Sequence, residues 1–382
     1  MRVAFYAPLK PPDHPVPSGD RLLAGLLQSA LRRAGHEVEL ACRLRSREPK
    51  GDPGRQERLR SLGARLAERY AARCRERPAA RRPDLWFTYH LYYKAPDWVG
   101  PLAARRLGIP YVVAEASVAG KRADGPWAAG HQATLAALEQ AAAVIALNPA
   151  DLPGLPPVRR LHGLPPFTDL APFRAAAAER TRHRSALAAS CALDPDQPWL
   201  LTVAMMRHGD KLASYRALAE ALGGLADLAW RLLIVGDGAA RAEVEAAFGG
   251  LPRARLRYLG ERPAGALPAV FAAADLYAWP AVNEAFGMAL LEAQGSGLPV
   301  VAGRYGGVAA VVAENRGGLL TPPGDLGAFG AALRALIGDP GRRAALRAGA
   351  GEAAAAHDLD AAAGALDAIL RQARDDFHTA QS

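Results

Sequence analysis

The stretch from residue 283 to residue 301 combines two carboxylates with the start of a short helix. Glu284 and Glu292 are separated by seven residues, and the run Phe286–Met288 between them predicts the first turn of a helix that glycines and a proline end before a buried strand. The free amides and positive dipole end of such a turn suit a phosphate or a hydroxyl-rich ligand. Carboxylates beside it would accept hydrogen bonds from sugar or ribose hydroxyls. The alternative interpretation is a capping carboxylate and an exposed helical glutamate.

Two cations follow another apolar run. Residues 200–204 read as a buried strand, and Arg207 and Lys211 come after its carboxyl end, which is where open α/β sheets bind ligands. With the helix amides at Gly287, these cations could stabilise the negative charge of a departing diphosphate. The chain shows no carboxylate-pair motif for Mg²⁺, so we expect this to occur without metal. The alternative is a pair of surface cations.

The elements that would position these groups alternate between strand and helix. Alternation of this kind predicts doubly wound parallel sheets. Strands are expected at 3–7, 38–40, 85–88, 111–114, 144–147, 200–204, 232–235, 256–259, 276–278 and 300–302. Helices are expected at 22–31, 101–107, 134–142, 215–222, 239–248, 267–273, 287–294 and 358–375.

A change of composition divides the chain. Residues 149–172 are rich in Pro, Gly and Leu, which predicts a boundary inside this stretch. We therefore expect an amino-terminal domain at 1–165, a carboxy-terminal domain at 166–357, and a last helix at 358–382 that returns to the first domain.

Four motifs of the second half occur in an order that resembles a known family. Besides the stretch at 283–301, they are the strand end with Arg207 and Lys211, Ile234–Gly238, Tyr258–Gly260, and the glycine loops at 303–307 and 317–320. Together they resemble the nucleotide-sugar signature of the retaining glycosyltransferases of family 4, densely over residues 198–327. The resemblance implies the GT-B fold, α/β, with two Rossmann-like doubly wound domains that face each other across a cleft.

The resemblance also implies a reaction and a set of residues. A sugar would move from a nucleotide-diphosphate sugar, UDP-linked, to a small molecule, glycan or lipid, with retention and without a cofactor or metal. Arg207 and Lys211 would clamp the diphosphate, Glu284 would lie by the transferred sugar, and Glu292 by the ribose or phosphate side. The implied donor-binding residues are Gly19, Gly236, Gly238, Leu259, Gly260, Phe286, Gly287, Met288 and Glu292.

The first half departs from the family at one position. Where the family commonly has a histidine after the strand at 111–114, this chain has Glu115. Either Glu115 takes over the sugar contact, or the role moves to His90, which follows the strand at 85–88. Both are retained as catalytic candidates, and the alternative for His90 is a structural histidine beside tyrosines.

Net charge is concentrated in one segment. Residues 43–82 hold fourteen Arg or Lys and five Asp or Glu, which accounts for the whole net charge of +9. Nucleic-acid binding is not expected, because the segment has a single aromatic residue, Tyr70. One interpretation is a solvated helix face with Arg58, Arg65, Arg69, Arg73 and Arg77. The other is contact with an anionic membrane or acceptor.

Several other classes of protein fit less well. Three scattered cysteines and the absence of a long apolar run predict a cytoplasmic protein, with the inner face of the cell membrane as a peripheral site. A dehydrogenase would need Gly-x-Gly-x-x-Gly, but residue 241 is Arg. A phosphorylase would need a longer chain. A sugar-nucleotide epimerase of the same fold and a non-catalytic two-lobed binding protein stay open.

Overall fold

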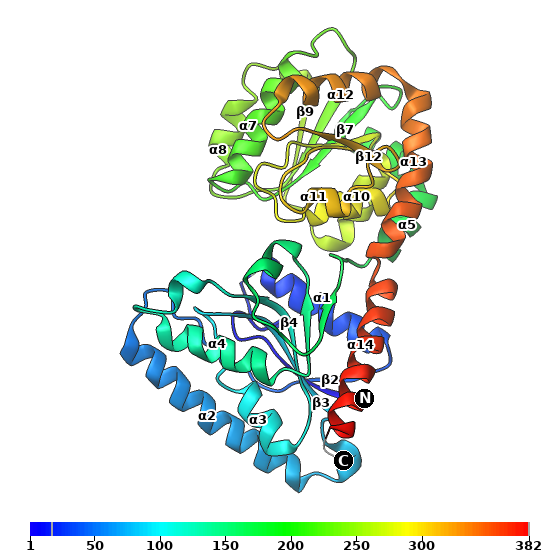
Figure 1. Ribbon diagram of the computed structural model, residues 1–382. Coiled ribbons are helices and arrows are strands. Elements are labelled where there is room, and N and C mark those ends of the chain that lie inside the picture. The colour runs from blue at the N-terminus through cyan, green and yellow to red at the C-terminus, as the bar shows by residue number, and fades with distance from the viewer. Residues whose placement is uncertain (17, 381–382) are drawn as a thin grey trace. The chain divides into compact units, whose positions relative to one another are not determined.

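The computed structural model describes residues 1–16 and 18–380, and its chain divides into two compact units (Figure 1). The first unit comprises Met1–Pro165 and Leu359–Ser382, and the second comprises Pro166–Asp358. Each unit contains one six-stranded sheet in which all pairings are parallel.

The sheet of the first unit has the strand order β2-β1-β3-β4-β5-β6. Its strands are β1 (Arg2–Tyr6), β2 (Glu37–Leu40), β3 (Leu85–Tyr92), β4 (Tyr111–Ser117), β5 (Ala143–Ala146) and β6 (Leu161–Gly163). Its helices are α1 (Gly19–Arg33), α2 (Pro53–Glu76), α3 (Gly100–Leu107), α4 (Ala128–Gln140) and α14 (Leu359–Thr379).

The sheet of the second unit has the strand order β12-β11-β10-β7-β8-β9. Its strands are β7 (Trp199–Val203), β8 (Arg231–Val235), β9 (Leu256–Gly260), β10 (Leu276–Trp279), β11 (Val300–Gly303) and β12 (Gly318–Thr321). Its helices are α5 (Ala171–Ala178), α6 (Arg180–Cys191), α7 (Asp210–Gly223), α8 (Arg241–Ala247), α9 (Leu267–Ala273), α10 (Met288–Gly295), α11 (Val308–Val311), α12 (Leu326–Gly338) and α13 (Pro340–Ala354).

The central strands are apolar without alternation because parallel strands are covered on both faces. Trp199, Leu200 and Leu201 of β7 are fully buried, as are Val300 and Val301 of β11. Polar groups mark the ends of elements instead. Ser18 caps α1 by accepting from the Arg21 amide.

The strand orders define one switch point in each sheet. In the first unit the chain runs outward in opposite directions from β1 and β3, and in the second unit from β7 and β10. Ligands of open α/β sheets bind outside the carboxyl ends of the two strands at such a point. The residues that follow these four strands are therefore the ones to inspect.

Two strands were missed in the sequence. β6 lies in the Pro-rich stretch that was interpreted as a boundary, and it pairs with β5 through Leu161, His162 and Gly163. β12 lies in what was interpreted as a glycine loop at 317–320, and it pairs with β11. Both are edge strands of three or four residues, which are too short to show a periodic pattern.

Element ends also differ from the sequence-based expectation. β3 and β4 run further than predicted, so His90 and Glu115 lie within strands and not after them. Gly19 is the first residue of α1 and not part of the preceding loop. The longer strands reflect pairing between β3 and β4, which continues to Tyr92 and Ser117 and is a tertiary contact.

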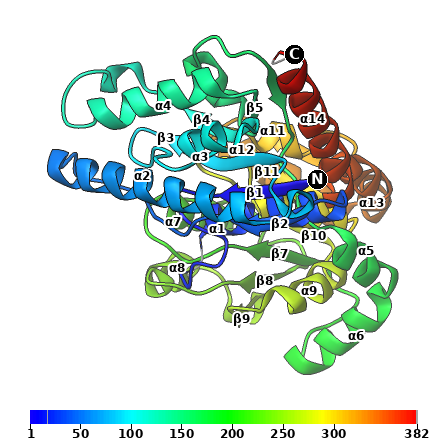
Figure 2. The same cartoon turned by 90° about the horizontal axis from the view of Figure 1, so that it is seen from below.

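The last helix belongs to the first unit. α14 packs against α1, and both views show the two helices side by side (Figure 2). Arg33 of α1 donates to Asp360 at 2.6 Å, and His36, which is buried, lies 3.2 Å from Asp367. Burial lowers the pKa of His36, which favours the neutral imidazole beside Asp367 at neutral pH.

Candidate functional site

The loop after β7 carries the first candidate cation of the second unit. Arg207 is exposed, and within residues 1–16 and 18–380 no carboxylate pairs with its guanidinium. The loop itself is well braced: Tyr215 donates to the Ala204 carbonyl at 2.7 Å, and the Met206 amide donates to the Asp237 carbonyl at 2.8 Å. Arg207 is thus an uncompensated positive charge on a firmly held backbone.

The glycines after β8 serve this bracing. Gly236 and Gly238 have φ of 141° and 148°, and a Cβ would lie 1.9 Å from the Ala204 carbonyl oxygen at the first and 2.4 Å from the Met206 carbonyl oxygen at the second. No side chain fits at such distances. The Gly-Asp-Gly turn therefore has a protein-internal reason to lack side chains, which is to let the turn contact the loop that holds Arg207.

Lys211 and Glu284 form an ion pair that joins the two sides of the switch point. Lys211 lies in the first turn of α7, which follows β7, and Glu284 lies in the loop that follows β10. Trp279, the last residue of β10, donates its indole N–H to Glu284 at 3.3 Å, and the Lys211 ammonium lies 5.5 Å from the Trp279 ring centroid. Two residues separated by 73 positions in the chain are thus in direct contact.

The loop between β10 and α10 has an unusual backbone. Ala281, Asn283 and Gly287 have φ of 59°, 49° and 72°. Left-handed conformations at two non-glycine residues are costly and occur where surrounding contacts enforce them. Here the Val282 amide donates to Ser214 and the Asn283 amide side chain donates to Asp210, both at 3.0 Å.

The N-terminus of α10 has no side-chain cap. Gly287 occupies the N-cap position, and no side chain caps the helix. Glycines of the 303–307 loop pack against the preceding turn: a Cβ on Gly306 would lie 2.3 Å from the Glu284 carbonyl oxygen, and one on Gly307 equally close to the Ala285 carbonyl oxygen. The exposed amides and positive dipole end at Gly287 and Met288 are suited to an anion.

Glu292 lies on α10 in an environment that disfavours its charge. Burial raises the pKa of its carboxyl group from 4.5 to about 7. In the described part of the chain no side chain donates a hydrogen bond to it. A half-buried carboxylate of this kind is available for hydroxyl groups of a ligand.

For the remaining donor-binding candidates, the structure shows their position but no contact that bears on a role in binding. Leu259 and Gly260 end β9, and the Gly260 carbonyl accepts from the Gly236 amide at 2.9 Å. Phe286 and Met288 flank the α10 N-cap and are half-buried. Their assignment to donor binding stays a prediction.

The switch point of the first unit brings Asp20 and His90 together. Asp20 lies in the first turn of α1, and its carboxylate is 2.9 Å from Nδ1 of His90 in β3. This hydrogen bond lowers the pKa of Asp20. Gly19, next to Asp20, has open space where a Cβ would lie, so no protein contact requires glycine there.

Glu115 faces His90 across the two strands. Tyr89 pairs with Ala114 and Leu91 with Ala116, which leaves His90 and Glu115 at facing positions. Both have positive φ, 63° and 59°. Burial, followed by the charges of Glu115 and Asp20, raises the pKa of Tyr89 well above its ordinary value. The structure therefore groups both catalytic candidates with Asp20 and does not choose between them.

The basic segment forms a helix with one exposed cationic face. Arg58, Leu62, Arg65 and Arg69 follow helical spacing on α2 and are exposed, and no carboxylate in the described residues pairs with these arginines. The predicted stripe ends earlier than expected, because Arg77 lies beyond the helix and pairs with Glu39 at 2.9 Å.

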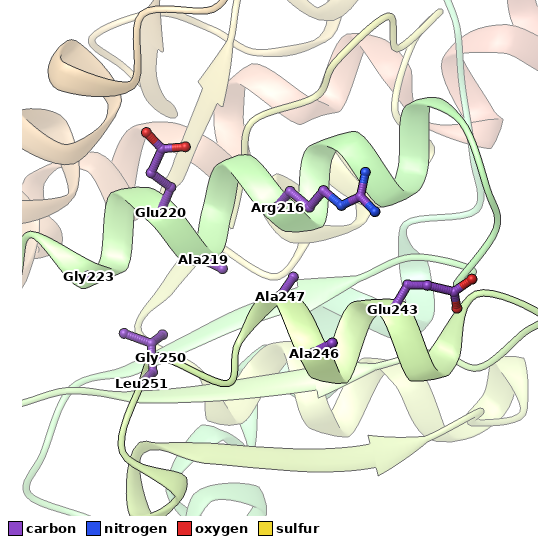
Figure 3. Close-up of a pocket in the computed structure, with 9 residues that line it drawn as sticks. All are labelled: Arg216, Ala219, Glu220, Gly223, Glu243, Ala246, Ala247, Gly250 and Leu251. Carbon is purple, nitrogen blue, oxygen red and sulfur yellow. The ribbon is translucent and has the colours of Figure 1, made fainter.

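Other features carry no predicted site residue. A groove of about 460 Å³ between α7 and α8 is lined mainly by Ala219, Ala246 and Ala247, with Arg216, Glu220 and Glu243 at its sides (Figure 3). Among the residues that the structure describes, no three His, Cys, Asp or Glu side chains gather as a metal ion would require. None of the helices described is long and apolar enough to span a membrane.

The sequence is similar to those of known proteins. The family described as Glycosyl transferases group 1 matches residues 197–339. A D-inositol 3-phosphate glycosyltransferase from Xylanimonas cellulosilytica is 30% identical over 321 residues, which cover 78% of this chain and 75% of that protein. The chain therefore belongs to the group 1 glycosyltransferases, family 4, and is a glycosyltransferase.

Solved structures share its fold. A sucrose-phosphate synthase from Thermosynechococcus elongatus has a TM-score of 0.68 at 22% identity, covering 97% of this chain and 98% of that one. Anabaena Alr3699/HepE in complex with UDP has a TM-score of 0.70 at 18% identity, covering 97% and 100%. The predicted α/β GT-B fold is confirmed.

Sequence analysis missed two residues of the candidate sites. Asp20 was assigned no role, although it lies in the first turn of the helix that follows the first strand, and such turns lie at the carboxyl edge of the sheet. Trp279 lies just outside the strand expected at 276–278 and was assigned no role. No sequence signal shows that its indole reaches Glu284, because that contact depends on the conformation of the loop after β10.

Proposed function

We propose that this protein transfers a sugar from a UDP-linked donor to an anionic acceptor, with retention of the anomeric configuration and without a metal ion. The contact between Lys211 and Glu284 carries the proposal. It joins a cation suited to phosphate and a carboxylate suited to sugar hydroxyls at the switch point of the second sheet, which is where α/β sheets bind nucleotides. The Anabaena neighbour was solved with UDP, which supports the choice of donor.

In this reaction the protein must stabilise the negative charge of the nucleoside diphosphate that leaves. The bond between the sugar C1 and the phosphate oxygen breaks, a bond from C1 to an acceptor oxygen forms on the same face, and the acceptor's proton leaves with the nucleoside diphosphate. Arg207, Lys211 and the amides at the start of α10 supply positive charge for this step. Loss of one such contact costs on the order of 2–4 kcal/mol in the transition state.

Each carboxylate has a separate task in this scheme. Glu284, already polarised by Lys211 and Trp279, accepts hydrogen bonds from the transferred sugar. Glu292, raised to a pKa of about 7 by burial, accepts from the donor's ribose. Those hydroxyls favour its ionised form, so donor binding and ionisation are coupled.

The acceptor belongs to the first unit in this proposal. The names of the relatives, D-inositol 3-phosphate glycosyltransferase and sucrose-phosphate synthase, point to phosphorylated substrates or products. An acceptor that is soluble or held in a lipid head group fits equally, and the exposed arginines of α2 support contact with an anionic membrane. His90 or Glu115 would contact the reacting sugar.

Nucleotide-induced stabilisation tests the proposal. The protein is unfolded thermally with UDP, GDP, ADP and their glucose conjugates, since a ligand at 100 times its dissociation constant adds about 2.7 kcal/mol. UDP and UDP-glucose should stabilise the protein, and Arg207→Ala should abolish the shift. NMR of the product's anomeric proton then shows whether the anomeric configuration of the donor is retained. Absence of any nucleotide effect, or formation of an epimerised sugar nucleotide in place of UDP, would show the proposal to be wrong.

A further inference from the structure

Trp279 is a buried residue at the carboxyl end of β10, inside the second sheet. Its backbone pairs with Ala302 of β11, and its ring meets the Tyr215 ring of α7 at a centroid distance of 5.1 Å and an interplanar angle of 80°. Tyr215 is held in turn, because its hydroxyl donates to the Ala204 carbonyl at 2.7 Å. A buried side chain of this size cannot change rotamer without disturbing its neighbours, so the core sets the position of the indole N–H.

The indole contacts both charged groups of the switch point. Its N–H donates to Oε2 of Glu284 at 3.3 Å, and its ring centroid lies 5.5 Å from the Lys211 ammonium. Lys211 donates to the same oxygen, Oε2. No donor in residues 1–16 and 18–380 reaches Oε1 of Glu284. The two contacts therefore occupy one carboxylate oxygen and leave the other for a ligand.

Lys211 cannot remain the main partner of Glu284 if it also binds the donor's phosphate. In the unliganded protein its ammonium pairs with the carboxylate, whereas a bound diphosphate offers it a larger negative charge. The indole N–H carries no net charge and is held by the core, so it stays at Oε2 when the ammonium turns to the phosphate. Trp279 is then the remaining side-chain donor to a carboxylate that is only 16% exposed. Without that donor, a carboxylate so far buried would lose free energy and a fixed orientation.

The backbone of Glu284 is held by contacts that do not include Trp279. Its amide donates to the Ala281 carbonyl at 3.0 Å, and its carbonyl oxygen lies against Gly306, where a Cβ would be 2.3 Å away. Removal of the indole N–H therefore releases the carboxylate without releasing the loop. The consequence is expected for a ligand group that contacts Glu284, and not for phosphate bound by Arg207 and the amides of α10.

We propose that Trp279 is a positioning residue for the transferred sugar. Its indole N–H holds Oε2 of Glu284 while Lys211 binds the diphosphate, and Oε1 accepts a hydrogen bond from a hydroxyl of the sugar. This inference rests on the proposed transferase function and deepens it, because it names the group that orients the sugar-binding carboxylate once the cation has turned away. A phenyl ring fills most of the same space and has no N–H, so the hydrogen bond can be tested apart from the packing.

Binding to the full-length protein is measured by calorimetry with UDP and with one UDP-sugar. The UDP-sugar is whichever of UDP-glucose, UDP-galactose and UDP-N-acetylglucosamine the wild type binds most tightly. Trp279→Phe should weaken its binding about tenfold, because a hydrogen bond to a charged group is lost. UDP binding should change less than about twofold, because UDP lacks the transferred sugar. Trp279→benzothienylalanine keeps the fused ring, lacks the N–H and should cause the same loss, so the test does not depend on how well a phenyl ring packs.

Two further variants separate positioning from packing. Trp230→Phe is the matched control, because Trp230 is buried before β8, its indole donates to the Leu225 carbonyl at 2.9 Å, and the Arg255 guanidinium lies 4.7 Å from its ring. This variant also loses a buried indole hydrogen bond and should leave binding of UDP and of the UDP-sugar unchanged. In the Glu284→Ala background, Trp279→Phe should change UDP-sugar binding less than about twofold, because the carboxylate that it positions is gone.

Three results overturn the inference and leave the proposed function standing. They are equal weakening of UDP and the UDP-sugar by Trp279→Phe, which is the result of a purely structural role; no weakening of either; and a loss that is undiminished in the Glu284→Ala background. A wild type that binds UDP but none of the UDP-sugars also overturns it, because there is then no sugar contact to support. If the wild type binds neither UDP nor any UDP-sugar, the proposed function fails and the inference fails with it.

Discussion

Replacement of Glu292 by Gln should stabilise the unliganded protein while weakening donor binding. Burial raises the pKa of Glu292 from 4.5 to about 7. The folded state therefore binds this proton more tightly than the unfolded state, so the group's contribution to stability falls as pH rises from 4.5 through 7. A pKa raised from 4.5 to about 7 corresponds to about 3 kcal/mol of lost stability above pH 7.

The assay is urea unfolding at pH 4 and at pH 8. Glu292→Gln removes the ionisation cost, so the variant should exceed the wild type by up to about 3 kcal/mol at pH 8 and match it at pH 4. Glu220→Gln, an exposed glutamate on α7, serves as the matched control and should change stability at neither pH.

Ligand binding supplies the second half of the prediction. UDP should bind the wild type more tightly as pH rises through 7, because ribose hydroxyls prefer the ionised carboxylate, and Glu292→Gln should lose this dependence. Equal stability of variant and wild type at pH 8, or a gain of the same size at pH 4, would refute the account of a charge held in an unfavourable environment.

Four further outcomes are expected. Arg207→Ala and Lys211→Ala should each weaken transition-state stabilisation by about 2–4 kcal/mol, which lowers kcat/KM on the order of a hundredfold. Unchanged UDP binding and turnover in both variants would show that these two cations do not bind the diphosphate. Glu284→Gln should lower turnover with UDP affinity almost intact, and an effect on UDP equal to that of Glu292→Gln would remove the distinction between the two carboxylates. Turnover should survive EDTA, because cations and helix amides balance the phosphate charge; activity lost with chelator and restored by Mg²⁺ or Mn²⁺ would contradict this. Sedimentation with anionic vesicles at low salt should exceed that with neutral vesicles and fall when Arg58, Arg65 and Arg69 are changed to Ala, at about 1 kcal/mol per basic residue; equal binding to both lipids would leave α2 a solvated helix.

Some of the site follows from local sequence. The N-cap at Gly287 and the helix that carries Glu292 can be predicted from consecutive residues, because a helix start needs glycine or a capping residue followed by helix formers. The buried strands β7 and β10 are likewise visible as apolar runs. Local pattern was not sufficient everywhere, because α12 and α13, of 13 and 15 residues, were not among the expected helices.

Other parts depend on pairing between distant segments. The edge strands β6 and β12 are recognisable only beside β5 and β11, because three or four residues carry no period of their own. His90 and Glu115 were placed after their strands, and the pairing of β3 with β4 incorporates both with positive φ. That conformation is enforced by neighbouring strands and leaves no mark in the sequence.

The sequence by itself determined the fold class and the residue types of the candidate donor site, since apolar runs, glycine turns and helix starts are local properties of the chain. Tertiary structure alone decided which of these residues meet. The contact of Lys211 with Glu284 and the pairing of Asp20 with His90 both arise from strand order. Strand order is set by long-range packing and burial, which no window of consecutive residues contains.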